Sequence, residues 1–191
     1  MIGSETSPAL PAPPQTRRWL PVATVAAVIL GVVAGGYLIA SALGEPEGGS
    51  VAVGTSVRVT PLPGWELAAR FADPEGIRLT RGSGNLDVAT IPFGGDDAEL
   101  LRTYAESVLA PDAEQFRVSD VVPVTLASGL HGSRITYVGL FGDVQSPIEG
   151  ELTAVVSPSG TGVVFDGWAP AGQLQFASRD IDTMIDTTKI A

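Results

Sequence analysis

Chemistry in this sequence would depend on acidic side chains, because the chain has one histidine and no cysteine. Glu149 and Glu151 lie two residues apart, so on a strand they would share one face. Paired carboxylates can act as general acid and base, or bind Ca²⁺. A solvent-exposed strand face explains them equally well and is the favoured interpretation, since acidic side chains are usually exposed.

The single histidine, His131, has no recognisable catalytic partner among its neighbours Leu130 to Ser133. A nucleophile assisted by histidine needs a base held by a third group, and a zinc site needs several nitrogen or sulfur ligands. We therefore interpret His131 as a residue of a turn or strand edge. Asp96 and Asp97 fit a helix cap better than a metal site. The sequence predicts no enzyme, no cofactor and no metal site.

Two tryptophans are the candidates for a ligand groove. Trp65 and Trp168 could line an apolar pocket, although packing in the core is the ordinary role of such large rings. The glycine pairs at 82–84 and 160–162 lack the Lys-Ser/Thr ending of a phosphate loop, and hairpin turns explain them.

The positions of these residues depend on closely spaced strands and two helices. Alternating apolar residues and short turns predict strands, which an antiparallel sheet would pair, over 57–60, 65–71, 77–80, 86–93, 116–126 (one or two strands, bent at an edge by Pro123), 130–141, 148–156 and 162–168. Helical spacing predicts a helix over 97–109 and an amphipathic helix from Leu174 to Ile185. We expect an α+β domain, with about six to eight antiparallel strands packed against two α-helices and preceded by one transmembrane helix.

An uncharged stretch of 25 residues, Trp19 to Leu43, precedes this domain. As a helix it would be roughly 37 Å long, enough to cross a bilayer core of about 30 Å. Arg17 and Arg18 precede it, and the positive-inside rule then places the N-terminus in the cytoplasm. The expected organisation is a disordered cytoplasmic head (1–18), a plasma-membrane helix (19–43), a flexible linker (44–56) and an extracytoplasmic domain (57–191).

Two features of the membrane stretch leave alternatives open. Residues 40–42 read Ala-Ser-Ala, a pattern that precedes signal-peptidase cleavage, so secretion after a cut near Ala42 is the alternative to a retained anchor. The run is longer than the core of an ordinary signal peptide, which favours the anchor. Gly31 and Gly35 match the small-residue spacing that lets two membrane helices pack closely, although such spacing also arises by chance.

Charge restricts the partners of the domain. After Leu43 the chain has nine basic and twenty acidic residues, a net charge of −11. Nucleic-acid binding needs a basic face, and so does binding flat on anionic lipid. We expect neither, and no oligomeric state follows from the sequence.

Residues 57–71, VRVTPLPGWELAARF, carry a family resemblance. A strand, then Pro63-Gly64-Trp65, then further strands and the helix at 97–109, resemble the PsbP-like fold, which also occurs in exported bacterial proteins such as LpqN-type mycobacterial lipoproteins. The resemblance implies a largely non-enzymatic binding or assembly role and no catalytic residue. The lipobox cysteine of those lipoproteins is absent here, and no ligand residue can be aligned.

The sequence thus favours a membrane-anchored, extracytoplasmic, non-catalytic binding or assembly module of a bacterial cell envelope. A possible partner of this module is another envelope protein. One alternative is a cell-envelope enzyme that uses Glu149, Glu151 or His131. The other is a carrier of an apolar ligand, which predicts a pocket of roughly 300 Å³ or more.

Overall fold

A computed structural model describes residues 49–142 and 146–191 of the chain. The predicted head, the predicted membrane helix and its Gly31 and Gly35 lie outside these residues. Within them, no helix combines the length and hydropathy needed to cross a bilayer.

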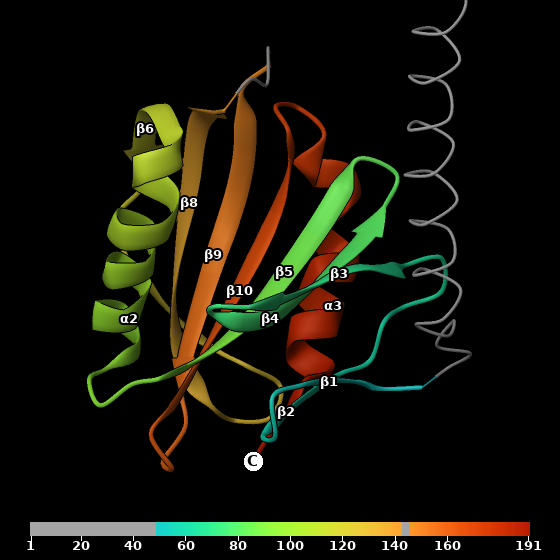
Figure 1. The fold of residues 1–191 in the computed structure, drawn as a ribbon, viewed down its shortest axis with the longest axis vertical. Helices are drawn as coiled ribbons and strands as arrows, with labels where there is room; N and C mark the ends of the chain where they lie inside the picture. Colours follow the sequence, from blue (N-terminus) through green and yellow to red (C-terminus); the bar gives the residue numbers. More distant parts are fainter. Residues whose placement is uncertain (1–48, 143–145) are drawn as a thin grey trace, which may run out of the picture. The chain divides into compact units, whose positions relative to one another are not determined.

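Eight antiparallel strands form the main sheet, as the sequence predicts (Figure 1). They are β3 (Glu66–Ala72), β4 (Glu75–Arg81), β5 (Gly84–Pro92), β6 (Ala113–Val118), β7 (Val122–Thr125), β8 (His131–Phe141), β9 (Ile148–Val156) and β10 (Thr161–Pro170). The order across the sheet is β3-β4-β5-β10-β9-β8-β6, and β7 pairs with β8. Pro123 lies on β7, whose pairing partner among the described strands is β8, in keeping with the predicted edge position.

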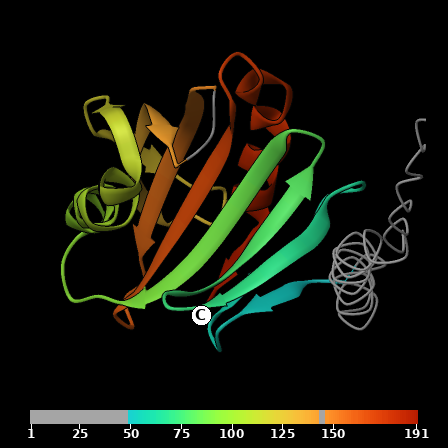
Figure 2. The same ribbon diagram turned by 45° about the horizontal axis from the view of Figure 1, so that its top comes forward.

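Helices cover the two faces of this sheet (Figure 2). The helix α2 (Asp97–Tyr104) continues as a π-helical turn, η2 (Ala105–Leu109), and a 3₁₀ turn, η3 (Ala110–Asp112). It packs on one face against β8, β9 and β10. On the other face, α3 (Ser178–Thr187), preceded by the 3₁₀ turn η4 (Leu174–Phe176), packs against β10. The two predicted helices and the α+β class are therefore confirmed.

Local chemistry explains where α2 begins. The side chain of Asp96 accepts a hydrogen bond of 2.7 Å from the backbone N–H of Glu99, as an N-cap does. Asp97 instead accepts a hydrogen bond of 2.6 Å from the Ser133 hydroxyl on β8, which fixes the helix to the sheet. Both aspartates thus have structural roles at the start of the helix.

The prediction of a flexible linker over residues 44–56 is wrong for the second half of that range. Val51–Val53 form a strand, β1, which pairs with β2 (Val57–Val59). The last strand, β11 (Lys189–Ile190), pairs with the other edge of β2 and completes a second, three-stranded sheet. The valines of β1 and β2 are buried with the apolar residues of α3, so the folded domain begins before residue 57. A strand of three residues is too short to show a periodic pattern.

Strand alternation divides the interior into two apolar clusters. Along β10, Val163 and Phe165 join the cluster beneath α3, whereas Val164 joins the cluster beneath α2. Asp166 is the next residue on the α2 face, and it is therefore placed inside the protein by the same alternation that buries its apolar neighbours.

Candidate functional site

The feature that marks the site is a buried carboxylate in the centre of the sheet. Asp166 is only 4% exposed. Tyr137 of β8 reaches across β9 and donates a hydrogen bond of 2.7 Å to its Oδ1 atom. Within the described part of the chain, no hydrogen bond joins the other carboxylate oxygen, Oδ2, and this oxygen is not among the fully buried unpaired atoms, so it keeps some contact with solvent. A buried acid with a free acceptor is an unusual group that points to a ligand or a proton.

Gly150 makes room for this hydrogen bond. It is paired with Tyr137 in the register of β8 and β9, and a Cβ atom at this position would overlap the tyrosine ring. The ring therefore lies over Gly150 of β9, and its hydroxyl reaches Asp166 on β10. Tyr137 also contacts Phe116 and Phe141, with ring centroids 5.7 and 6.0 Å away, so an aromatic cluster holds its position.

An ion pair lies next to the acid. Arg78 of β4 donates two hydrogen bonds of 2.7 Å to the two carboxylate oxygens of Asp87 on β5. The guanidinium carbon lies 5.1 Å from the ring centroid of Trp168 and 5.8 Å from that of Phe71. The indole N–H of Trp168 donates a longer hydrogen bond of 3.4 Å to Asp87. These contacts hold the arginine firmly against two aromatic rings.

These side chains line two hollows, of about 310 and 270 Å³. The residues common to both linings are Arg78, Asp87, Leu109, Phe141 and Asp166. Because five residues are shared, we treat the two hollows as one site and call it the Asp166 cavity. Tyr104 and Val108 add the α2 and η2 side of the lining, and Trp168 and Ile148 add the sheet side. The π-helical turn is thus part of its wall, as such turns often are at functional sites.

The electrostatics of the cavity depend mainly on burial. The net pKa of Asp166 is raised to about 7, chiefly because burial removes its hydration and also because Asp87 carries a negative charge. The Tyr137 hydrogen bond and the positive charge of Arg78 act in the opposite direction. Burial also raises the pKa of Tyr137 and of Tyr104, so both phenols stay protonated at neutral pH. Asp166 is therefore the group in this cavity that changes its charge near pH 7.

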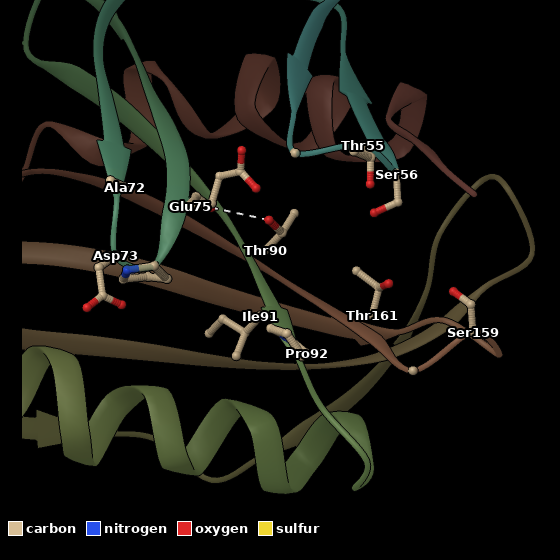
Figure 3. Close-up of a pocket in the computed structure, with 13 residues that line it drawn as sticks. Thr55, Ser56, Ala72, Asp73, Glu75, Thr90, Ile91, Pro92, Ser159 and Thr161 are labelled. Atoms are coloured by element: carbon tan, nitrogen blue, oxygen red, sulfur yellow. Dashed lines mark hydrogen bonds between the residues drawn. The ribbon is translucent and has the colours of Figure 1, made fainter.

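A larger hollow, of about 570 Å³, lies elsewhere, between the β1–β2 turn, the β3–β4 turn and the β9–β10 turn (Figure 3). Short hydroxyl side chains line much of it, among them Thr55, Ser56 and Thr90. Its carboxylates, Asp73 and Glu75, are exposed. Size alone does not make it the better candidate, because no buried charged group converges on it among the described residues.

Glu149 and Glu151 share a face of β9, as expected, but it is the face opposite Asp166. Arg134 forms an ion pair of 2.9 Å with Glu151 and one of 3.1 Å with Asp182 of α3. Burial and Asp182 raise the pKa of Glu151, and Arg134 lowers it. Glu149 accepts a hydrogen bond of 2.9 Å from the backbone N–H of Leu174. Both glutamates thus link the sheet to the C-terminal helical segment.

The other sequence candidates are also separated by the fold. Trp65 is buried in the cluster beneath α3 and donates a hydrogen bond of 3.1 Å to Asp180, so it does not share a groove with Trp168. His131 is exposed and contacts Thr125 at 3.3 Å. Of the residues singled out in the sequence, Trp168 is the one that lines the Asp166 cavity.

Sequence reasoning missed the acids, the arginine and the tyrosines of this cavity. One signal was present: Asp166 interrupts an otherwise apolar strand, Val163 to Trp168, where a charge has to be buried. The remaining members lie on separate strands and on α2, and the sequence alone does not give the order of these elements in space. Within the described residues, no group of three or more His, Cys, Asp or Glu side chains could hold a metal ion.

The fold is PsbP-like, as the resemblance of residues 57–71 implies. The solution structure of cyanobacterial PsbP (CyanoP) from Synechocystis sp. PCC 6803 is 13% identical, with a TM-score of 0.50 over 71% of this chain and 87% of that protein. LpqN of Mycobacterium tuberculosis, described as involved in cell envelope biogenesis, is 16% identical, with a TM-score of 0.50 over 74% of this chain and 89% of LpqN.

The same fold also occurs in a protein of a different kind. The Ran-binding protein Mog1p of Saccharomyces cerevisiae is 11% identical, with a TM-score of 0.54 over 74% of this chain and 94% of Mog1p. No protein-family model and no curated protein sequence matches the chain. At these identities the likeness establishes the fold, and function has to be argued from the site.

Proposed function

We propose that this chain is a binding module of a bacterial cell envelope, in which residues 19–43 anchor an extracytoplasmic domain that holds a small ligand without changing it chemically. The observation that carries the proposal is Asp166, a buried carboxylate with a free oxygen in an aromatic cavity. A deep, largely apolar hollow with a few convergent polar groups is the usual form of a small-molecule site.

The lining of the cavity favours binding over catalysis. Among the described residues, its lining contains no serine, threonine, cysteine, lysine or histidine, so the only nucleophiles that it offers are carboxylates and phenols. The Asp87 carboxylate is fully engaged by Arg78. The raised pKa of both tyrosines makes them poor acids at neutral pH. An enzyme would have to work with Asp166 and the exposed rim carboxylates of Asp73 and Asp112.

A carrier of a purely apolar ligand is the second candidate, because the two hollows have about the volume that such a ligand needs. A hydrocarbon would, however, remove water from the free oxygen of Asp166 without replacing its hydrogen bonds. A ligand with both an apolar body and a polar group fits the lining better.

The envelope location is supported by the uncharged stretch and the arginines that precede it, and by the likeness to LpqN. A topology reporter tests this part. Alkaline phosphatase, which is active outside the cytoplasm, should be active when fused after Ala191 through a spacer, and green fluorescent protein at the same position should be dark. Activity of the cytoplasmic reporter alone would contradict the location.

Binding is tested with the full-length chain in phosphatidylcholine nanodiscs and three small probes: 2-phenylethylamine, 2-phenylethanol and 3-phenylpropanoate. Methyl NMR signals of Leu109 and Ile148 should shift with at least one probe, because both side chains line the cavity. Leu109→Trp should fill the cavity and abolish these shifts. Val138→Trp is the matched control, because Val138 is 39% exposed on the opposite face. No response to any probe would contradict the binding role.

A further inference from the structure

We propose that the ligand of the Asp166 cavity is a small organic cation, an amine whose ammonium group binds Asp166 and whose apolar body lies against the aromatic walls. This inference rests on the proposed binding function and names the class of ligand.

The charges of the lining point to a cation. Arg78 and Asp87 neutralise each other through two short hydrogen bonds. An ionised Asp166 is then left as the uncompensated charge at the floor of the cavity. An ammonium group at hydrogen-bond distance from Oδ2 would supply the missing positive charge and the missing donor together. The rim of the cavity also favours a cation, because Asp73 and Asp112 are acidic and exposed there.

The walls suit the rest of such a molecule. The rings of Tyr137, Phe141 and Trp168 line the same hollow as the carboxylate, and the faces of aromatic rings attract cations. The same cavity already holds one cation in this manner, because the Arg78 guanidinium lies over the ring of Trp168. The volumes of about 270 and 310 Å³ admit a molecule with an aromatic or short aliphatic body.

An anion is the alternative that this geometry disfavours. It would need Arg78 as its partner, yet that guanidinium is bound on two of its nitrogens by Asp87. An entering carboxylate or phosphate would also face the negative charges of Asp87 and Asp166. Arg78 therefore completes the cavity wall and does not act as an anion receptor.

Affinity for the cation should depend on pH through Asp166. The charged and titratable groups that face it are Arg78 on β4, Asp87 on β5, Tyr137 on β8 and Tyr104 on α2, with Asp73 and Asp112 at the rim. The pKa of Asp166 lies at about 7, and burial keeps both tyrosines protonated. An alkylammonium group stays charged below pH 9, so affinity should rise with pH and level off above 7.

The test uses the same three probes, which differ mainly in charge, with the full-length chain in phosphatidylcholine nanodiscs. At pH 8 the amine should bind about tenfold more tightly than the alcohol, because a charge-assisted hydrogen bond replaces a neutral one. From pH 5.5 to pH 8.5 the affinity for the amine should rise by roughly thirtyfold, while that for the alcohol changes little. Asp166→Asn should remove both the preference for the amine and its pH dependence. Asp120→Asn, which removes the same charge from an exposed loop, should change neither.

The possible outcomes separate the ligand class from the binding function. If the alcohol binds as tightly as the amine and Leu109→Trp abolishes both, the cavity binds ligands but the cation is wrong. Tightest binding of 3-phenylpropanoate would likewise overturn the cation. If the pH dependence persists in Asp166→Asn, another group is responsible and the inference fails. If none of the probes binds, the proposed function fails with it.

Discussion

The buried acid makes a prediction about folding stability that can be worked out from its pKa. An ordinary aspartate has a pKa of 3.8, and that of Asp166 is about 7. Below pH 3.8 the folded and unfolded chains both hold the proton. Between the two values the unfolded chain releases its proton while the folded chain retains it, so stability falls as pH rises. Above pH 7 both states are ionised and the loss is complete.

Each pH unit between these values corresponds to about 1.36 kcal/mol, so ionisation of Asp166 destabilises the fold by roughly 4 kcal/mol in total. About 2.5 kcal/mol of this falls between pH 5 and pH 8. Asp166→Asn has nearly the same shape, keeps an acceptor for Tyr137 and cannot ionise. Its free energy of unfolding relative to the parent chain should therefore increase by about 2.5 kcal/mol over this pH range.

Urea unfolding of the full-length chain in nanodiscs, followed by tryptophan fluorescence at pH 5, 6, 7 and 8, measures this difference. Asp120→Asn is the control, because Asp120 is exposed in the loop between β6 and β7. Its difference from the parent should stay constant with pH. A pH-independent difference for Asp166→Asn, or one that grows toward acid, would refute the assignment of Asp166 as a buried acid that ionises near pH 7.

Three further predictions concern the surroundings of the cavity and the start of the domain. Tyr137→Phe removes the donor to Asp166 and should lower stability by about 1–3 kcal/mol at pH 8, but less at pH 5, where the acid is protonated; urea unfolding at both pH values checks this. Gly150→Ala should lower stability by about 1–3 kcal/mol because the new methyl group overlaps the Tyr137 ring, whereas Gly94→Ala, in open space, should have little effect on the melting temperature. Val53→Ala should lower the free energy of unfolding by about 2 kcal/mol, since Val53 is 1% exposed; a value near zero would restore the linker interpretation.

Much of the fold could be predicted because apolar residues alternate with polar ones along the longer strands and recur at helical spacing along the two helices. β9 was predicted from Ile148 to Val156, where it lies, and the helix predicted from Asp97 to Leu109 spans α2 and η2. The second sheet could not be predicted, because β1 and β11 have three and two residues. Such strands depend on partners far along the chain and not on their own periodicity.

The site was harder to predict than the fold. Most of its polar members come from β4, β5, β8 and β10, which the order β4-β5-β10-β9-β8 brings together, and Tyr104 comes from α2. No local pattern reveals that Arg78 lies beside Trp168. The close spacing of Glu149 and Glu151 made them candidates in the sequence. In the structure, Glu151 forms an ion pair with Arg134, and Glu149 accepts a hydrogen bond from the backbone N–H of Leu174. The more informative signal was a single charge, Asp166, in a strand that otherwise has no reason to contain one.

The pairing of β2 with both β1 and β11 affects when the domain can fold during its synthesis. Val51 and Val59 are buried on the same small sheet that Ile190 completes, and the backbone N–H of Ala191 donates a hydrogen bond to the carbonyl of Ser56. During translation, about 140 further residues must therefore be added after residue 51 before β11 can complete this sheet. A nascent chain lacking 178–191 would leave these valines without the apolar residues of α3 and without the β11 strand, so this part of the core forms only after the C-terminal segment has been made.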